Sequence, residues 1–177
     1  AMQRTILCWD VLCQRSDQYY AQKAKAVPHV LNFDAELVLD ARTFKRPVNY
    51  LLVHVKPPEG VTINPRQRPF VVVDPRAGHG PGIGGFKADS ELGVAMRAGH
   101  PCYFVGFTPE PMPGQTIEDI MHAEAIFLEK VIELNPEAEG KPCIIGNCQA
   151  GWAVMMLAAT RPELCGPVIV PGSPLSY

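Results

Sequence analysis

The sequence predicts an α/β fold in which a mostly parallel sheet carries helices on both faces. Short apolar runs alternate with segments of helical periodicity along most of the 177 residues. The runs at 69–74 and 102–107 are compact and apolar, as is typical of strands buried on both faces. Proline and glycine fall between the runs, where one element ends and the next begins.

The N-terminal part begins with a helix and continues with two strands. Helical spacing extends to about residue 24, with Ile6, Trp9 and Cys13 on one face. Strand candidates follow at 36–40 and 48–55, bounded by turn residues and prolines. We therefore expect a helical segment over residues 1–30 and the body of the fold over 31–177.

From residue 69 onward, strands and helices alternate regularly. Alternation of this kind specifies a parallel sheet, because the crossover between two parallel strands usually passes through a helix. In such sheets the chemistry gathers at the carboxyl ends of the strands. The expected strands and helices, in order, are 69–74, 88–98, 102–107, 116–135, 142–145, 149–160 and 167–170.

The longest helix of the body begins with a variant of the capping box, in which Asp119 follows Thr116 by three residues. Glu124 interrupts its apolar stripe, and we expect this carboxylate at the edge of the core, in reach of solvent or a basic partner. His122 lies beside the stripe and is expected at the surface. The stripe consists of Ile117, Ile120, Met121, Phe127, Leu128, Val131 and Ile132.

The helix expected at 149–160 is apolar nearly all round, so we expect it to be buried, with Trp152, Met155 and Met156 in the core. The absence of secretion signals favours reduced thiols over a disulfide framework. The cysteines expected to pack as small apolar side chains are Cys8, Cys13, Cys102, Cys143 and Cys165.

Composition narrows the function classes. A net charge of −2 without a basic cluster argues against nucleic acid as a partner. No apolar run is long enough for a transmembrane helix and the N-terminus lacks the regions of a signal peptide, so we expect a cytoplasmic protein. The five histidines are scattered and no metal-binding spacing occurs, so we expect neither a metal site nor a cofactor.

The stretch Gly146-Asn147-Cys148-Gln149-Ala150-Gly151 carries the clearest functional signal. It joins an expected strand to an expected helix and has the spacing of the Gly-x-Ser-x-Gly nucleophile elbow, with cysteine in place of serine. Small residues are needed there because bulky neighbours would collide in so tight a turn. We expect Cys148 to be a nucleophile whose thiolate the helix N-terminus stabilises, and the backbone amide of Gln149 to face the oxyanion. The competing interpretation is a buried cysteine at a glycine turn.

A glycine-rich loop at 77–85 is the second signal. In an elbow fold the corresponding loop supplies the other oxyanion amide, and His79 and Gly80 are the candidates for it. The same loop matches the Gly-x-Gly-x-x-Gly dinucleotide fingerprint on paper, but Pro81 lies inside the match and no acid follows the next strand directly. A surface loop without a function remains the third interpretation.

The usual partners of an elbow nucleophile are missing from the chain. The order in this fold is nucleophile, acid, histidine, yet no histidine follows His122 and Glu163 is the only acid beyond Cys148. We therefore expect a fragment, truncated after the strand that follows the nucleophile helix. Such a sheet would expose an unpaired edge, which favours self-association or a homo-oligomer.

The elbow sequence resembles the lipase-like box of polyhydroxyalkanoate synthases, in which cysteine replaces the serine of lipases. The longer motifs at 68–85, 113–119 and 174–177 are similar to a bacterial family of unknown function, commonly labelled 3-hydroxyalkanoate synthetase-like. This resemblance covers about residues 14–177 and implies the N-terminal portion of an α/β-hydrolase-like protein. It also implies a thiol nucleophile, matched by Cys148, that accepts a 3-hydroxyacyl group from a coenzyme A thioester.

Three functions are compatible with these observations. The first is an acyltransferase of the polyhydroxyalkanoate synthase type, acting on a small-molecule acyl thioester. The second is a thioesterase or esterase, in which water accepts the acyl group. The third is a non-catalytic α/β-hydrolase-fold interaction module, which the missing acid and base would fit.

Overall fold

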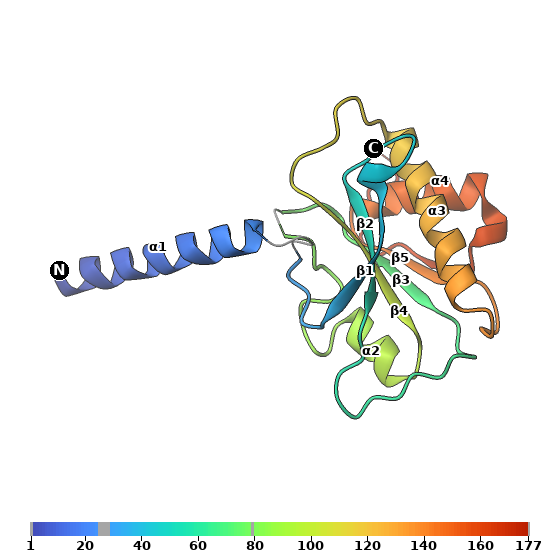
Figure 1. The fold of residues 1–177 in the computed structure, drawn as a ribbon, viewed down its shortest axis with the longest axis horizontal. Coiled ribbons are helices and arrows are strands. Elements are labelled where there is room, and N and C mark those ends of the chain that lie inside the picture. The colour runs from blue at the N-terminus through green and yellow to red at the C-terminus, as the bar shows by residue number, and fades with distance from the viewer. Residues whose placement is uncertain (1, 25–28, 79, 177) are drawn as a thin grey trace.

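The computed structural model describes residues 2–24, 29–78 and 80–176 and contains one sheet with the strand order β1-β2-β4-β3-β5-β6 (Figure 1). The strands β4, β3, β5 and β6 are parallel, whereas β2 pairs antiparallel with both β1 and β4. The expectation of a mostly parallel sheet is therefore confirmed. The strands are β1 Ala35–Asp40, β2 Tyr50–Val55, β3 Phe70–Val73, β4 Cys102–Phe107, β5 Cys143–Gly146 and β6 Val168–Ile169.

Helices cover both faces of the sheet (Figure 1). The helices α3 and α4 lie together on one face, and α2 lies on the other. Successive strand residues point to opposite faces, so Val71 and Val73 of β3 pack in the cluster with α3 and α4, while Val72 packs with α2. The helices are α1 Met2–Lys23, α2 Glu91–Arg97, α3 Ile117–Leu134 and α4 Ala150–Thr160, with short 3₁₀ turns at Ala41–Thr43 and Pro162–Leu164.

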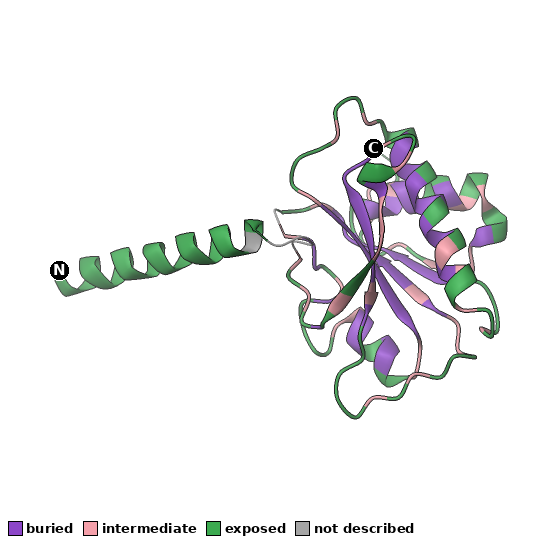
Figure 2. Ribbon diagram, viewed as in Figure 1, coloured by how far each residue is buried: buried purple, intermediate pink, exposed green. Residues whose placement is uncertain are grey.

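The helix α1 forms where helical spacing predicts it, but its side chains from Met2 to Ala21 are exposed (Figure 2). Ile6 and Trp9 are 62% and 65% exposed, and the prediction that Cys8 and Cys13 are packed is wrong. The reason is that α1 makes no extensive contact with any other helix or strand in the described part of the chain. Within those same residues, no helix combines the length and apolar character that crossing a membrane requires.

The helix α4 differs from its expected burial. Ala153, Val154 and Leu157 face the core, but Met155 and Met156 are 41% and 38% exposed, so the prediction that these methionines lie in the core is wrong. The helix packs on α3 and β5 with one side only. A uniformly apolar sequence has no polar stripe to mark its outward face, and the opposite side therefore remains exposed.

The start of α3 agrees with its sequence. The Thr116 hydroxyl accepts a hydrogen bond from the Asp119 amide at 3.2 Å, and the Asp119 carboxylate accepts one from the Thr116 amide at 2.9 Å. The apolar stripe is buried except at its ends, where Ile117 is 56% exposed and Ile132 is half-buried. His122 is exposed and lies 3.4 Å from Glu118, at the surface as expected.

Glu124 is the clearest departure from the sequence-based expectation. Its side chain is only 3% exposed, and neither carboxylate oxygen has a hydrogen-bond partner among the described residues. The expectation that it reaches solvent or a basic partner is therefore wrong. Burial raises the pKa of Glu124 to about 8, because the low-polarity interior disfavours the charged form.

Candidate active site

The turn between β5 and α4 holds Cys148 in a backbone conformation that side chains rarely adopt. Its φ is +48°, and Arg76 is the one other non-glycine residue with a positive φ in the described part of the chain. The turn is closed by the Ala150 amide, which donates to the Asn147 carbonyl at 2.9 Å, and by the Gly151 amide, which donates to the Cys148 carbonyl at 3.1 Å. Strain of this kind persists only where surrounding structure enforces it, and such residues cluster at active sites.

Small residues allow this turn to form. A Cβ atom at Gly146 would lie 3.1 Å from the Gly151 Cα atom, and one at Gly151 would lie 1.9 Å from the Ser173 Oγ atom. Ser173 donates a hydrogen bond to the Gly146 carbonyl at 3.2 Å, and the Cys148 amide donates to the Pro171 carbonyl at 2.9 Å. The segment after β6 is thus attached to the elbow, a contact that the spacing of the elbow residues alone does not reveal.

The thiol and the neighbouring amide are both open to a ligand. Cys148 and Gln149 are exposed, while Asn147 and Ala150 on either side are buried. The Gln149 amide donates no hydrogen bond to any residue that the structure describes. It follows Cys148 directly at the start of α4, where helix N-terminal amides are unpaired and the helix dipole favours negative charge.

Asn147 connects the elbow to the opposite face of the sheet. Its side-chain amide donates to the Glu91 carboxylate at 2.8 Å, and Glu91 begins α2. The glycine-rich loop passes beside this contact, since a Cβ atom at Gly84 would lie 2.7 Å from the Glu91 carboxylate and 2.6 Å from Val72. The absence of a side chain at Gly84 therefore lets the loop, the elbow and α2 approach one another.

The glycine-rich loop is organised by the buried carboxylate of Asp74, at the carboxyl end of β3. One of its oxygens accepts a hydrogen bond from the Arg76 amide at 2.8 Å. The other accepts from the amides of Gly82 at 2.7 Å and Ile83 at 3.0 Å. Gly80 is half-buried within this loop, whereas His79 lies outside the described residues, so the structure does not place the predicted His79 amide.

The same hydrogen bonds argue against dinucleotide binding by the glycine-rich loop. A phosphate cradle needs free amides in the glycine loop and at the start of the following helix. Here the Gly82 and Ile83 amides are taken by Asp74, and α2 begins only at Glu91, six residues after Gly85. The geometry therefore favours a loop braced against the sheet over one that wraps a pyrophosphate.

Sequence reasoning missed a polar cluster beside this loop, which contains Asn49, Arg76 and Gln115. The Asn49 Oδ1 atom accepts hydrogen bonds from Arg76 Nη1 and from Gln115 Nε2, both at 2.9 Å. Gln115 Oε1 in turn accepts from the Asn49 amide at 3.0 Å. The Arg76 guanidinium lies over the Phe107 ring at 5.0 Å. No local pattern joins these residues, because they come from segments far apart in the sequence.

Tyr50 lies between this cluster and the core. Its Cα pairs with that of Phe107 at the carboxyl end of β4, and the Arg76 guanidinium lies 5.8 Å from its ring. Burial, followed by the nearby Glu124, raises the pKa of Tyr50 to about 12. The carboxyl end of the sheet therefore combines an exposed thiol with a braced loop and buried ionisable groups.

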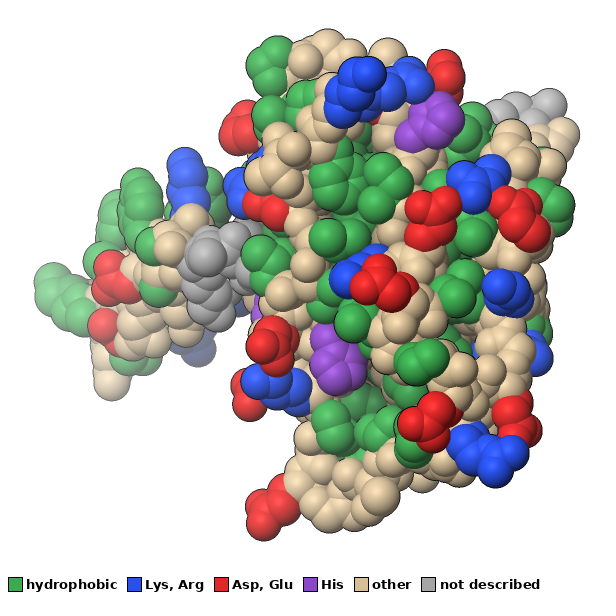
Figure 3. Space-filling model, turned by 45° about the vertical axis from the view of Figure 1, so that its right-hand side comes forward, with side chains coloured by type: hydrophobic (Ala, Val, Ile, Leu, Met, Phe, Trp, Pro, Cys, Tyr) green, Lys and Arg blue, Asp and Glu red, His purple; other side chains and the backbone are tan. Residues whose placement is uncertain are grey.

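The acid and base of a triad are not assembled around Cys148 by the residues that the structure describes. Glu163, the only acid beyond Cys148, forms an exposed ion pair with Arg161 at 2.5 Å. That pairing, chiefly the hydrogen bond from Arg161, lowers the pKa of Glu163. On the face shown in Figure 3, acidic and basic side chains are interspersed without a large patch of one sign.

Comparison with known proteins places the chain in a family. The model of a family described as "Protein of unknown function (DUF3141)" matches residues 1–177. A relative from Rhizobium meliloti, described as "Uncharacterized protein in ackA 5'region", is 66% identical over 177 residues. The chain spans 24% of the length of that relative.

Solved structures show the fold. A probable hydrolytic enzyme of Pseudomonas aeruginosa is 12% identical and superposes with a TM-score of 0.54, over 86% of this chain and 45% of that enzyme. A fungal esterase of Rhizomucor miehei is 14% identical with a TM-score of 0.50, over 86% and 47%. At these identities the likeness concerns the fold alone. The expected α/β-hydrolase-like fold is confirmed, and the turn that holds Cys148 joins a strand to a helix within it.

Proposed function

Because the chain belongs to the DUF3141 family and has an α/β-hydrolase-like fold, we propose that it carries the nucleophile half of an acyl-transfer site, with Cys148 as the nucleophile. One observation carries the proposal. An exposed thiol is held at a φ of +48° between β5 and α4, beside a backbone amide without a partner among the described residues. A nucleophile elbow has this combination of features.

The proposed chemistry begins when the Cys148 sulfur attacks the carbonyl carbon of an acyl thioester. The negative charge that develops on the carbonyl oxygen is stabilised by the Gln149 amide and by a second amide from the loop at 77–85, for which His79 and Gly80 are the candidates. Collapse breaks the bond between the acyl carbon and the coenzyme A sulfur. The proton lost by Cys148 ends on the departing thiol, and the acyl group remains on Cys148 as a thioester.

A cysteine favours transfer over hydrolysis. Exchange of one thioester for another is nearly neutral in energy, which suits an enzyme that passes an acyl group onward. The resemblance to 3-hydroxyalkanoate synthetase-like proteins suggests a 3-hydroxyacyl-coenzyme A as the donor. The acid and base that would complete the site are proposed to lie in the rest of a longer protein. The R. meliloti relative has such a length, since this chain spans 24% of it.

A thioesterase or esterase is the second candidate. The solved structures that share the fold include a hydrolytic enzyme and an esterase, which supports a hydrolase as the broader class. The two candidates share the acyl-enzyme at Cys148 and differ in the acceptor, which is water in one and a hydroxyl of a growing chain in the other.

The test uses the full-length protein with 3-hydroxybutyryl-coenzyme A. We expect an added acyl mass on the peptide that contains Cys148, lost in Cys148→Ala and retained in the matched control Cys165→Ala. Free acid as product indicates a hydrolase, whereas an extended oligomer indicates a polymerising transferase. Absence of the acyl peptide, together with unchanged turnover in Cys148→Ala, would contradict both enzyme candidates and favour the non-catalytic module.

A further inference from the structure

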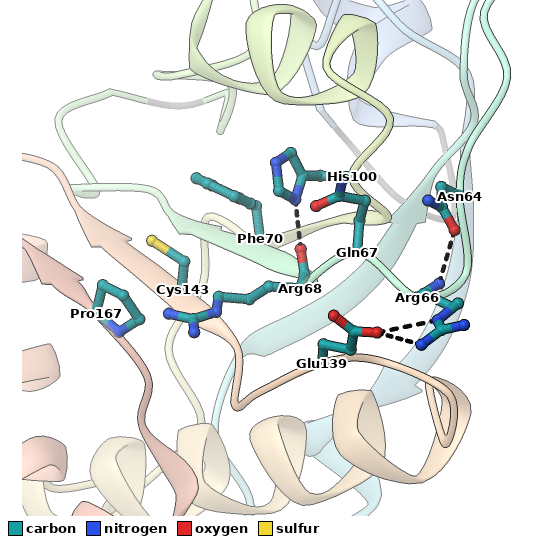
Figure 4. Close-up of a pocket in the computed structure, with 9 residues that line it drawn as sticks. All are labelled: Asn64, Arg66, Gln67, Arg68, Phe70, His100, Glu139, Cys143 and Pro167. Atoms are coloured by element: carbon teal, nitrogen blue, oxygen red, sulfur yellow. Dashed lines mark hydrogen bonds and ion pairs between the residues drawn. The ribbon is translucent and has the colours of Figure 1, made fainter.

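A hollow of about 520 Å³ opens at the end of the sheet opposite to Cys148 (Figure 4). Phe70 and Cys143, which begin β3 and β5, and Pro167, which precedes β6, contribute its apolar part. Arginine, histidine and amide side chains supply the polar part. Pockets for small molecules have this size and this mixture of apolar and polar lining.

Two arginines of the same loop line this hollow, and their charges differ in how they are balanced. Arg66 is paired with Glu139, whose carboxylate accepts from Arg66 Nε at 3.0 Å and Nη2 at 2.5 Å. Arg68 forms no ion pair with a carboxylate in the described part of the chain. The hollow therefore carries one positive charge in excess.

Contacts hold Arg68 at both its side chain and its backbone. A Cβ atom at Gly140 would lie 2.7 Å from Arg68 Nη2, so the guanidinium rests on a backbone that has a φ of +105° and bears no side chain. The Arg68 carbonyl accepts a hydrogen bond from His100 Nδ1 at 2.8 Å, and the His100 ring packs edge-on against Phe70 with ring centroids 4.7 Å apart. Figure 4 shows Arg68 extending toward Cys143 and Pro167.

The guanidinium also acts electrostatically on the hollow. Its positive charge lowers the pKa of the Cys143 thiol, although burial has the larger effect and leaves that pKa raised overall. Because Arg68 is half-buried, its field is screened less than that of a fully solvated surface charge.

We propose that this hollow binds a small organic anion. Its carboxylate or phosphate group faces Arg68, and its apolar part lies against Phe70 and Pro167. A guanidinium recognises either group through paired hydrogen bonds. The volume exceeds what an inorganic ion would fill, and the apolar side chains give the remainder of the ligand a surface to cover. This site is separate from the one around Cys148 and does not depend on the function proposed for that residue.

Binding is tested by calorimetric titration of the full-length protein with phenyl phosphate, benzoate and neutral benzyl alcohol. We expect phenyl phosphate or benzoate to bind and benzyl alcohol not to bind, and the stronger of the two anions identifies the preferred group. Weakening in high salt is expected, because the attraction is partly electrostatic.

Two variants of the lining side chains locate the site. We expect Arg68→Gln to weaken binding of the anion at least about tenfold, the loss typical of one charge-assisted contact. The double variant Arg66→Gln with Glu139→Gln removes a balanced pair and keeps the net charge of the hollow, so it should change binding less than about threefold. Cys148→Ala should bind as tightly as the unaltered protein. Equal losses in Arg68→Gln and in the double variant, loss in Cys148→Ala, or no binding of either anion at 10 mM (on the order of 3 kcal/mol of affinity) would each overturn the proposal.

Discussion

The two ends of β5 carry two cysteines with opposite properties. Cys143 begins the strand, is 3% exposed and has a pKa raised by burial. Cys148 lies just past the other end, exposed and with a positive φ. The comparison teaches that the exposure of a thiol in this fold depends on which end of the strand carries it, because only the carboxyl end of β5 turns abruptly into a helix.

The two ends of the sheet are also held together by different means. At the carboxyl end, Asp74 binds backbone amides of the glycine-rich loop, and Asn49 links Arg76 to Gln115. At the amino end, the Glu139 amide donates a backbone hydrogen bond to the Arg66 carbonyl at 2.8 Å, and the charged side chains of the same two residues pair at the surface. A buried carboxylate therefore organises the loop at one end, whereas an exposed ion pair adds to backbone contacts at the other.

The largest expected difference concerns thiol alkylation. In the native 177-residue chain, with Cys8 and Cys13 replaced by serine to remove exposed thiols, iodoacetamide should modify Cys148 at least about 10³ times faster than Cys143. Cys143 can react only when its strand opens. Peptide mass spectrometry over time gives both rates, and in urea they should converge. Comparable rates in the native chain would remove the contrast between the two ends.

A second test addresses the buried carboxylate beside Tyr50. Since the pKa of Glu124 is raised to about 8 from 4.5, the folded state keeps a proton that the unfolded state loses. Stability should therefore fall as the pH rises from about 4.5 to 8, by an amount on the order of 5 kcal/mol, and level off above that range. Urea denaturation of the chain at several pH values measures this slope.

The variant Glu124→Met should flatten that slope and raise stability near pH 8. Glu133 is an exposed carboxylate on the same helix, so Glu133→Gln is the matched control and should leave the slope intact. A slope that persists in Glu124→Met would assign the pH dependence to other groups.

A third test concerns the close packing at the elbow. Helix propensity alone predicts that Gly151→Ala stabilises α4. The new Cβ atom would instead lie 1.9 Å from Ser173 Oγ, so we expect a loss of about 1–3 kcal/mol, measured by urea denaturation. The double variant with Ser173→Gly should recover part of it, and Gly78→Ala, where nothing lies within 4 Å, serves as the control. If Gly151→Ala stabilises the protein, the segment after β6 moves easily to accommodate the new Cβ atom.

The smallest expected effect belongs to the amino end. Arg66 and Glu139 are 69% and 67% exposed, so Arg66→Gln should change the free energy of unfolding by less than about 0.5 kcal/mol. A loss above about 1 kcal/mol would indicate that the exposed ion pair adds substantially to the backbone hydrogen bond that joins the same two residues.

Features with a local cause could be predicted from the sequence. The strand Cys102–Phe107 has the predicted bounds, and Thr116 begins a helix with the expected capping box, because both depend on neighbouring residues. The expected strand at 48–55 begins only at Tyr50, since the Asn49 amide binds Gln115 instead of continuing the ladder. That contact spans 66 residues, beyond what any local pattern can encode.

The location of the candidate site could be predicted from the sequence because it also depends on neighbouring residues. Gly146 and Cys148 belong to one short motif, so their positions followed from spacing. The roles predicted for Cys148, Gln149 and Gly80 stay predictions, and His79 lies outside the described residues. The buried Glu124 and the exposed Met155 could not be foreseen, because which side of a helix faces the core depends on its tertiary partners.

The hydrogen bond from the Cys148 amide to the Pro171 carbonyl has a consequence for local motion. It couples the turn that bears the thiol to the chain that leaves β6, so a change that stabilises this bond from one segment also stabilises the other. Slower amide exchange at Cys148 would then report events at either place. The position of the Cys148 thiol would in that sense depend on the position of the chain that follows β6.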